Sequence, residues 1–244
     1  MPSNPDRGSA APLNPDRLTL PRRPSRLSLR LLKHHLPLCA FTLICTYLLY
    51  VTRPYQDVLS KISFATAYPS LTLLTATLLI GPLNLLRKRR QPLSSDLRRD
   101  FGIWAGLLGI IHAAVGQCVH LRGRPWLYYV YGPTEHHHLP IRHDLFGVAN
   151  YTGAASTLLL LALFITSNDY SLRALGSPRW KQLQRWNYAV FLLAAIHSVA
   201  YLAIEKQQPS FWVLVAALIA IAAFFQGAGF LKRRSAMSAK SSLS

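Results

Sequence analysis

The chain has 244 residues, of which 51% are hydrophobic and 15% are charged, and its formal net charge is +18 at pH 7. The charged residues cluster between long apolar runs, which soluble domains rarely contain and multi-pass membrane proteins require. Because the basic residues fall between those runs, they indicate membrane topology and argue against nucleic acid as a partner. The three cysteines lie inside apolar runs and are expected to be buried thiols.

The order of segments predicts an integral membrane domain between two basic segments. Residues 1–35 are rich in Pro, Arg and Ser and are expected to be disordered, without the apolar core of a signal peptide. Six apolar runs of about membrane length follow, at residues 36–51, 64–86, 101–121, 145–166, 186–204 and 211–231. The predicted fold class is therefore an all-α integral membrane protein, a six-transmembrane-helix bundle over residues 36–231. Residues 232–244 form a short basic tail.

The distribution of Lys and Arg predicts the orientation in the lipid bilayer. The N-terminal segment, residues 87–100, residues 167–185 and the tail together hold 21 of the 27 basic residues. By the positive-inside rule, these four segments and both termini are cytoplasmic, as in a multi-pass protein of the bacterial inner membrane. The third and fifth runs then cross the membrane in the same direction.

Two histidines lie at matching depths in those two parallel runs. His112 is 14 residues after Arg98, and His197 is 12 residues after Arg185. Intramembrane ionisable residues are rare and mostly functional, and two imidazoles at one depth can ligate a haem iron from both sides. The sequence therefore predicts one haem b, bound between helices 3 and 5 with His112 and His197 as axial metal ligands.

Small residues surround His112 and would give a flat porphyrin room near the backbone. Among these small residues, Gly109 and Gly116 are the predicted cofactor-binding positions. The alternative is that the small residues form a helix-packing face and that each histidine makes one interhelical hydrogen bond. His120 lies eight residues beyond His112 near the outer interface, and Glu205 has the comparable depth on the fifth run. A second, outer haem would therefore lack a histidine partner there.

The exterior loop between the third and fourth runs carries a cluster of histidines, His136, His137, His138 and His143. With Glu135 and Asp144 nearby, the cluster is a candidate iron or copper site. Its spacing matches no defined zinc pattern, so a polar loop is the other interpretation. His34 and His35, before the first run, are expected at the level of the lipid headgroups.

Three segments together form a recognisable pattern: RRDFGIWAGLLGIIH at 98–112, GVANYTG at 147–153 and TSNDYSLRALGSPRWKQLQRWNYAVFLLAAIH at 166–197. In these segments the chain resembles the ferric reductase-like transmembrane domain family. The family includes ferric reductases, NADPH oxidases and the haem-binding membrane subunit of the bacterial methionine sulfoxide reductase system. Its members often hold two haems with paired histidines, but here the inner pair is replaced by Gln184, Arg98 and Arg99. This departure from the family pattern argues for one haem.

The resemblance also implies a direction of electron flow. Because the chain has no Gly-rich phosphate loop, any flavin and nicotinamide chemistry is expected from another polypeptide. The short methionine sulfoxide reductase subunit is thus the nearer model. It implies a cytoplasmic flavin reductase or a quinone as donor, FMN or FAD at the cytoplasmic face as an open alternative, and an exterior acceptor protein.

Two rival functions remain open at the level of the sequence. One is a ferric reductase for iron uptake, with a ferric chelate as acceptor, which iron binding by the exterior histidines would favour. The other is a membrane transporter or assembly protein without haem, although no internal repeat supports a transporter. In the haem interpretation the chain is the electron-transfer subunit of an oxidoreductase.

Overall fold

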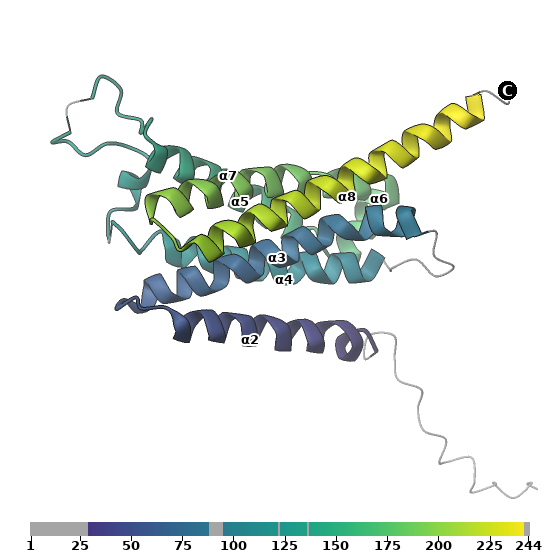
Figure 1. Ribbon diagram of the computed structural model, residues 1–244, viewed down its shortest axis with the longest axis horizontal. Helices are drawn as coiled ribbons and strands as arrows, with labels where there is room; N and C mark the ends of the chain where they lie inside the picture. Colours follow the sequence, from purple (N-terminus) through teal and green to yellow (C-terminus); the bar gives the residue numbers. More distant parts are fainter. Residues whose placement is uncertain (1–28, 88–94, 122, 136, 242–244) are drawn as a thin grey trace, which may run out of the picture.

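The computed structural model describes residues 29–87, 95–121, 123–135 and 137–241, which form a bundle of long helices lying side by side (Figure 1). In chain order the elements are the π-helical turn η2 (Leu31–His35), α2 (Leu36–Thr52), α3 (Val58–Arg87), α4 (Ser95–Gly116), the 3-10 turn η3 (Pro125–Tyr128), α5 (Leu145–Ile165), α6 (Asp169–Gln184), α7 (Asn187–Ile204) and α8 (Pro209–Ser241). This confirms the predicted all-α fold class. The predicted disordered segment lies mostly outside the described residues.

Five helical segments are long and apolar enough to cross a membrane: Leu31–Thr52, Val58–Arg87, Leu145–Ile165, Asp169–Ile204 and Pro209–Ser238. Helix α4 is not among them, because its first turns carry four charged residues and its apolar part ends at Gly116. At 1.5 Å per residue, the part from Phe101 to Gly116 covers only about 24 Å of a ~30 Å hydrocarbon core. The predicted count of six spans is therefore not confirmed.

Helix α4 ends five residues before the predicted boundary at Leu121 because a tyrosine caps it. Tyr128 is 1% exposed, and its hydroxyl donates a hydrogen bond to the Gly116 carbonyl (3.1 Å). The same oxygen accepts from the backbone N–H groups of His120 (2.8 Å) and Leu121 (3.3 Å). One side chain thus satisfies three backbone groups that a longer helix would have paired internally.

The segment between α5 and α7, predicted as a connection, forms the helix α6. Its N-cap is Asn168, whose side chain accepts a hydrogen bond from the Ser171 backbone N–H (2.8 Å). Gly176 breaks the helix with a φ of 71°, which glycine adopts without steric cost, and Pro178 follows. At the other end of the chain, α8 continues as helix through most of the predicted tail, to Ser241.

The core lies between α3, α4, α5 and α7. Helix α3 packs against α4, α8 and α2, and α5 packs against α7 and α4. The buried apolar residues of the main cluster are Leu38, Leu73, Leu74, Ala105, Leu108, Leu160, Leu163 and Val190. Small polar side chains join the helices, as in other membrane bundles: Ser70 donates to the Ala105 carbonyl (2.9 Å), and Ser156 donates to the Val190 carbonyl (3.0 Å).

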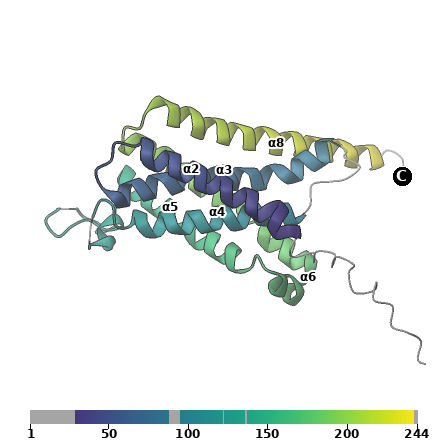
Figure 2. The same ribbon diagram turned by 90° about the horizontal axis from the view of Figure 1, so that it is seen from below.

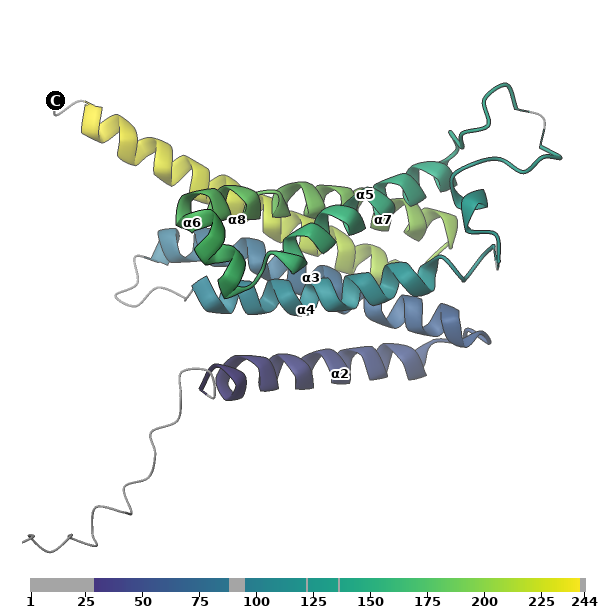
Figure 3. The ribbon, with the colours of Figure 1, turned by 180° about the vertical axis from the view of Figure 1, so that it is seen from behind.

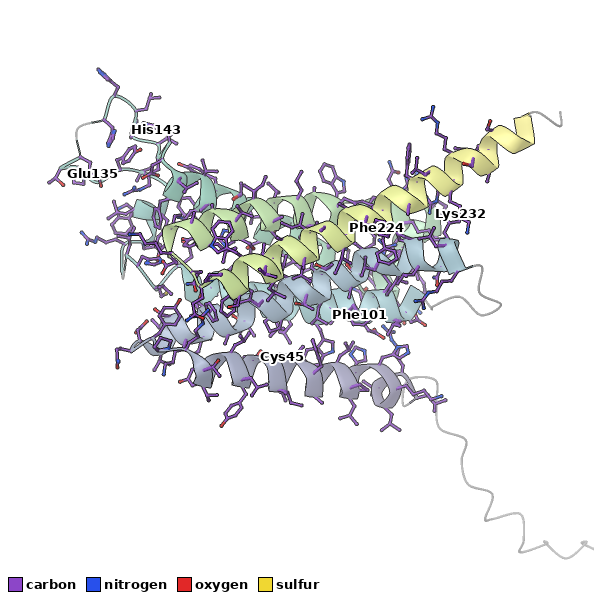
Figure 4. The ribbon with its side chains drawn as sticks, in the orientation of Figure 1. Cys45, Phe101, Glu135, His143, Phe224 and Lys232 are labelled. Carbon is purple, nitrogen blue, oxygen red and sulfur yellow. The ribbon has the colours of Figure 1, made fainter. Side chains whose placement is uncertain are left out.

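The two ends of the bundle carry different segments. The start of α2, the start of α4, α6 and the end of α8 lie at one end, and the loop before α5 lies at the other (Figures 1 and 3). Figure 2 shows α8 and α6 on opposite sides of the bundle. Glu135 and His143 mark the projecting loop, and Lys232 marks the opposite end (Figure 4). The segments predicted to be cytoplasmic therefore gather at one end of the bundle.

Candidate functional site

The fold brings His112 of α4 and His197 of α7 together. Their ring centroids are 5.9 Å apart, and the ring planes cross at 76°. Helix α4 packs against α3 and α5, whereas α7 packs against α5 and α8, so the imidazoles meet across the bundle rather than along one tight helix contact. Both rings are half-buried. His112 and His197, which were predicted to lie at the same depth in the membrane, are thus close together in the structure.

Each imidazole is anchored on a backbone carbonyl of a neighbouring helix. His112 Nδ1 lies 2.8 Å from the Ser63 carbonyl oxygen, with the Ser63 hydroxyl at 3.3 Å, and His197 Nδ1 lies 2.8 Å from the Ala149 carbonyl oxygen. A carbonyl oxygen can only accept, so Nδ1 of each ring carries the proton. Nε2 then keeps its lone pair, which is the arrangement in which a histidine ligates a metal.

Gly153 of α5 allows His197 its position, and the sequence did not identify this residue as part of the site. A Cβ at residue 153 would lie 2.5 Å from His197 Nδ1 and 2.8 Å from Cε1, closer than any real contact. The only signal in the sequence was the position of Gly153 in GVANYTG, four residues after Ala149 and therefore on the same helix face.

The two glycines predicted to contact the cofactor have different surroundings. A Cβ at Gly109 would lie 2.7 Å from Leu160 Cδ2 and 3.0 Å from Ser70 Oγ, so this glycine permits close packing of α4 on α5 and α3. At Gly116 the nearest atom is Ser63 Oγ at 3.5 Å, an ordinary contact. A role of Gly109 and Gly116 in holding haem stays a prediction.

A buried polar cluster occupies the end of the bundle that carries α6. Asp100 is fully buried; its carboxylate is paired with Arg30, and one of its oxygens lies 2.8 Å from His34 Nδ1. His35 Nε2 lies 3.3 Å from the same carboxylate, and the expected position of both histidines at the level of the lipid headgroups stays a prediction. Burial alone would raise the pKa of Asp100. The hydrogen bonds from Arg30 and His34 have a larger combined effect in the opposite direction, so the pKa of Asp100 is lowered overall.

Beside this cluster is a cavity of about 250 Å³, lined by Arg30, Leu31, His35, Arg99, Ile103, Ser167, Asn168 and Asp169. Arg99 pairs with Asp169 at 2.5 Å. Its Nε is buried and has no hydrogen-bond partner among the described residues. The same is true of Gln184 Nε2. Arg99 and Gln184, which the sequence analysis named in place of an inner histidine pair, thus each have one buried donor atom without a partner.

The loop between α4 and α5, predicted to be exterior, is ordered by ring stacking. Tyr131 stacks on His137 with a centroid distance of 3.6 Å and meets His143 at 5.2 Å. Within the described ranges, no group of three or more His, Cys, Asp or Glu side chains is arranged to hold a metal ion. His136 lies outside those ranges. The predicted alternative of a metal site in this loop therefore has no support from the described histidines.

These features define a class: a multi-pass membrane protein in which two anchored histidines from different helices meet between the helices. Comparison with known proteins refines the class, although no family model matches the chain. The chain is 32% identical over 164 residues to the protein-methionine-sulfoxide reductase heme-binding subunit MsrQ of Yersinia pseudotuberculosis serotype O:1b (strain IP 31758). The match covers 67% of this chain and 73% of that relative.

The heme-binding subunit MsrQ of Yersinia pestis (strain Pestoides F) is equally similar, with 32% identity over 67% of this chain and 72% of the relative. The chain therefore belongs to the MsrQ family of protein-methionine-sulfoxide reductase subunits, as the resemblance predicted. Together with the apolar helices, the family identifies a multi-pass inner-membrane protein that acts with a partner.

Proposed function

We propose that this chain binds one haem b between α4 and α7 and passes single electrons across the bacterial inner membrane. Electrons arrive at the end that carries α6 and leave toward an acceptor protein at the end that carries the exterior loop. The single observation that carries the proposal is the His112–His197 pair with both Nδ1 atoms bonded to carbonyl oxygens. The names of the relatives, which are heme-binding subunits, agree with it.

The residues present fit a haem iron. A metal about 2 Å from one nitrogen of each imidazole requires ring centroids roughly 6 Å apart, and the observed distance is 5.9 Å. When bound, haem b supplies a one-electron ferric/ferrous couple. His112 and His197 would hold the iron, while Ser63 and Ala149 fix the ring orientation and Gly153 leaves room for His197.

The cavity at the other end supports a donor site for a planar reductant. Arg30 and Arg99 each face an aspartate, so the cavity has little net charge and suits a neutral quinol or an isoalloxazine ring better than a phosphate. The unpaired Nε of Arg99 can donate to a ring carbonyl. We favour a membrane quinol, with a cytoplasmic flavin reductase, or FMN or FAD bound at this face, as the alternative.

Nothing in the described residues favours the two rival functions. A ferric reductase would be supported by iron ligands in the exterior loop, and the described histidines there form none. A helix-packing role without haem would account for the interhelical hydrogen bond that each histidine makes, but it would not require the two imidazoles to meet at 5.9 Å.

The test is a reduced-minus-oxidised absorption spectrum of the protein purified from haem-replete cells. We expect a b-type spectrum in the wild type and its loss in His112→Ala and in His197→Ala, because each removes one axial ligand. His143→Ala, an exterior-loop histidine, is the matched control and should keep the spectrum. A colourless wild-type protein, or full haem content in both ligand variants, would contradict the proposal.

A further inference from the structure

A column of polar and aromatic side chains connects His197 to the outer surface. Helix α7 presents His197, Tyr201 and Glu205 at intervals of four residues, so all three lie on one face. The centroid of the Tyr201 ring lies 4.9 Å from that of the His197 ring. It also lies 6.1 Å from that of His120, which follows the end of α4, with an interplanar angle of 17°. A single aromatic ring therefore separates the candidate iron ligand from His120.

The column ends in an ion pair. His120 Nε2 lies 3.0 Å from Glu205 Oε1, and the two side chains are 35% and 30% exposed. The pair therefore has access to exterior water while its other sides are covered by rings: Phe146 lies 6.0 Å and Tyr128 6.4 Å from His120. The comparable depth of His120 and Glu205 in the sequence corresponds to a direct contact.

Other polar and charged side chains lie around this pair. Tyr201 donates a hydrogen bond to Asn150 Oδ1 (2.9 Å), and Tyr128 bonds to backbone groups of α4 and the turn after it. On the α5 side, Arg142 lies 5.3 Å from the Phe146 ring centroid and pairs with Asp144 at 2.7 Å, and Lys206 directly follows Glu205 in the chain. In the column itself, the pair places an imidazole, the side-chain type suited to proton exchange near neutral pH, 3.0 Å from a carboxylate.

We infer that the His120–Glu205 pair takes up a proton from the exterior when the haem is reduced, and releases it when the haem is oxidised. The inference rests on the proposed haem at His112 and His197. One electron from the donor reduces ferric to ferrous iron, and one proton from exterior water binds the pair, so the charge added inside the membrane is compensated. When the acceptor oxidises the haem, the electron passes to the acceptor and the pair releases its proton to exterior water.

The physical reason is the position of the pair in a poorly solvated column. Adding an electron to the iron makes its surroundings more negative, which favours the protonated form of a nearby imidazole. Covering rings lower the local dielectric and strengthen this interaction, while the outer exposure of His120 and Glu205 supplies the proton. A solely structural ion pair would not need to lie one ring away from His197.

The test is the haem reduction potential of the purified holoprotein, measured by spectroelectrochemistry between pH 5.5 and 8.5. In the wild type the potential should fall as pH rises, because a protonated pair stabilises the reduced form. For full one-to-one coupling a tenfold change in proton activity corresponds to about 59 mV. His120→Gln and Glu205→Gln should each flatten this dependence while keeping the b-type spectrum.

His143→Gln, a loop histidine away from the column, should retain the wild-type pH dependence. A flat wild-type profile would overturn the inference because it would show that reduction takes up no proton. An unchanged slope in His120→Gln and Glu205→Gln would also overturn it, because another group such as a haem propionate would then carry the proton. Both outcomes would leave the proposed haem intact. Loss of haem in Glu205→Gln would also overturn it, because the pair would then be structural. Absence of haem from the wild type would refute the proposed function itself.

Discussion

At the scale of single residues, the site depends on a glycine as much as on the histidines. His197 reaches the Ala149 carbonyl only because residue 153 has no Cβ, which would lie 2.5 Å from Nδ1. A motion of either helix could relieve the contact, but α5 and α7 pack closely along their length. The imidazole is therefore the group that must move, and its anchor on Ala149 would be lost with it.

We predict that Gly153→Ala weakens haem retention about tenfold or more, since overpacking typically costs about 1–3 kcal/mol. Haem content per protein after purification measures this. Gly227→Ala, in the middle of α8 with nothing within 4 Å of the new Cβ, should leave haem content unchanged. Equal haem content in the two variants would show that His197 tolerates displacement.

Gly116→Ala tests whether this position gives room to a cofactor. The protein itself accepts the added methyl group, whose nearest neighbour is Ser63 Oγ at 3.5 Å. If Gly116 faces the haem as predicted, Gly116→Ala should lower haem content severalfold while the melting temperature of the haem-free protein stays within the error of wild type. Unchanged haem content would reduce Gly116 to a helix-packing position.

At the scale of elements, α2 is held mainly at its ends. Many of its apolar side chains are exposed, as expected for a helix that faces lipid. At one end Arg30 and His34 pair with Asp100 of α4. At the other end Arg53 lies between the rings of Phe64 and Phe211, 4.1 and 3.9 Å from their centroids. Polar anchors thus dock a helix that the hydrophobic effect cannot hold in lipid.

We predict that Asp100→Asn destabilises the protein by about 2–4 kcal/mol at pH 7, because it leaves the Arg30 cation without its buried partner. Because the pKa of Asp100 is lowered in the folded protein, its contribution to stability is fully present above the unfolded pKa of 3.8 and is lost below it, as the pH falls through the lower folded pKa. The thermal midpoint of wild type in detergent should therefore drop once the pH falls below 3.8, and Asp100→Asn should show a smaller drop there. Parallel pH profiles would contradict this role.

At the scale of the whole molecule, the sequence predicted what depends on local pattern. Apolar runs located the helices, and residue spacing predicted a common depth for His112 and His197 and a comparable depth for His120 and Glu205, which are in contact in the structure. It missed what depends on contacts between distant segments: the end of α4 set by Tyr128, the pairing of His34 with Asp100, and the close approach of Gly153 to His197. These contacts join residues that are far apart in the chain, so the pattern of neighbouring residues does not reveal them.

The number of membrane crossings is five or six, depending on whether α4 crosses the bilayer. This number decides whether the two termini lie on the same side of the membrane. Five crossings would put the N- and C-termini on opposite sides, whereas a sixth, through α4, puts both in the cytoplasm as the basic residues predict. The apolar part of α4 is about 24 Å long, but the turns after Gly116 continue outward to Leu121 under the Tyr128 cap. A short helix can cross by local thinning of the bilayer.

Single cysteines in a background lacking Cys39, Cys45 and Cys118 test this directly. In intact spheroplasts, a membrane-impermeant maleimide should label Arg124→Cys, beyond the outer end of α4, and should not label Asp96→Cys, at its start. Ala236→Cys, near the end of α8, should react only after permeabilisation, as Asp96→Cys should. Labelling of Asp96→Cys and Arg124→Cys from the same side would show that α4 does not cross. His112 and His197 would then not share one depth in the bilayer, and the proposed path of electrons across the membrane would be contradicted.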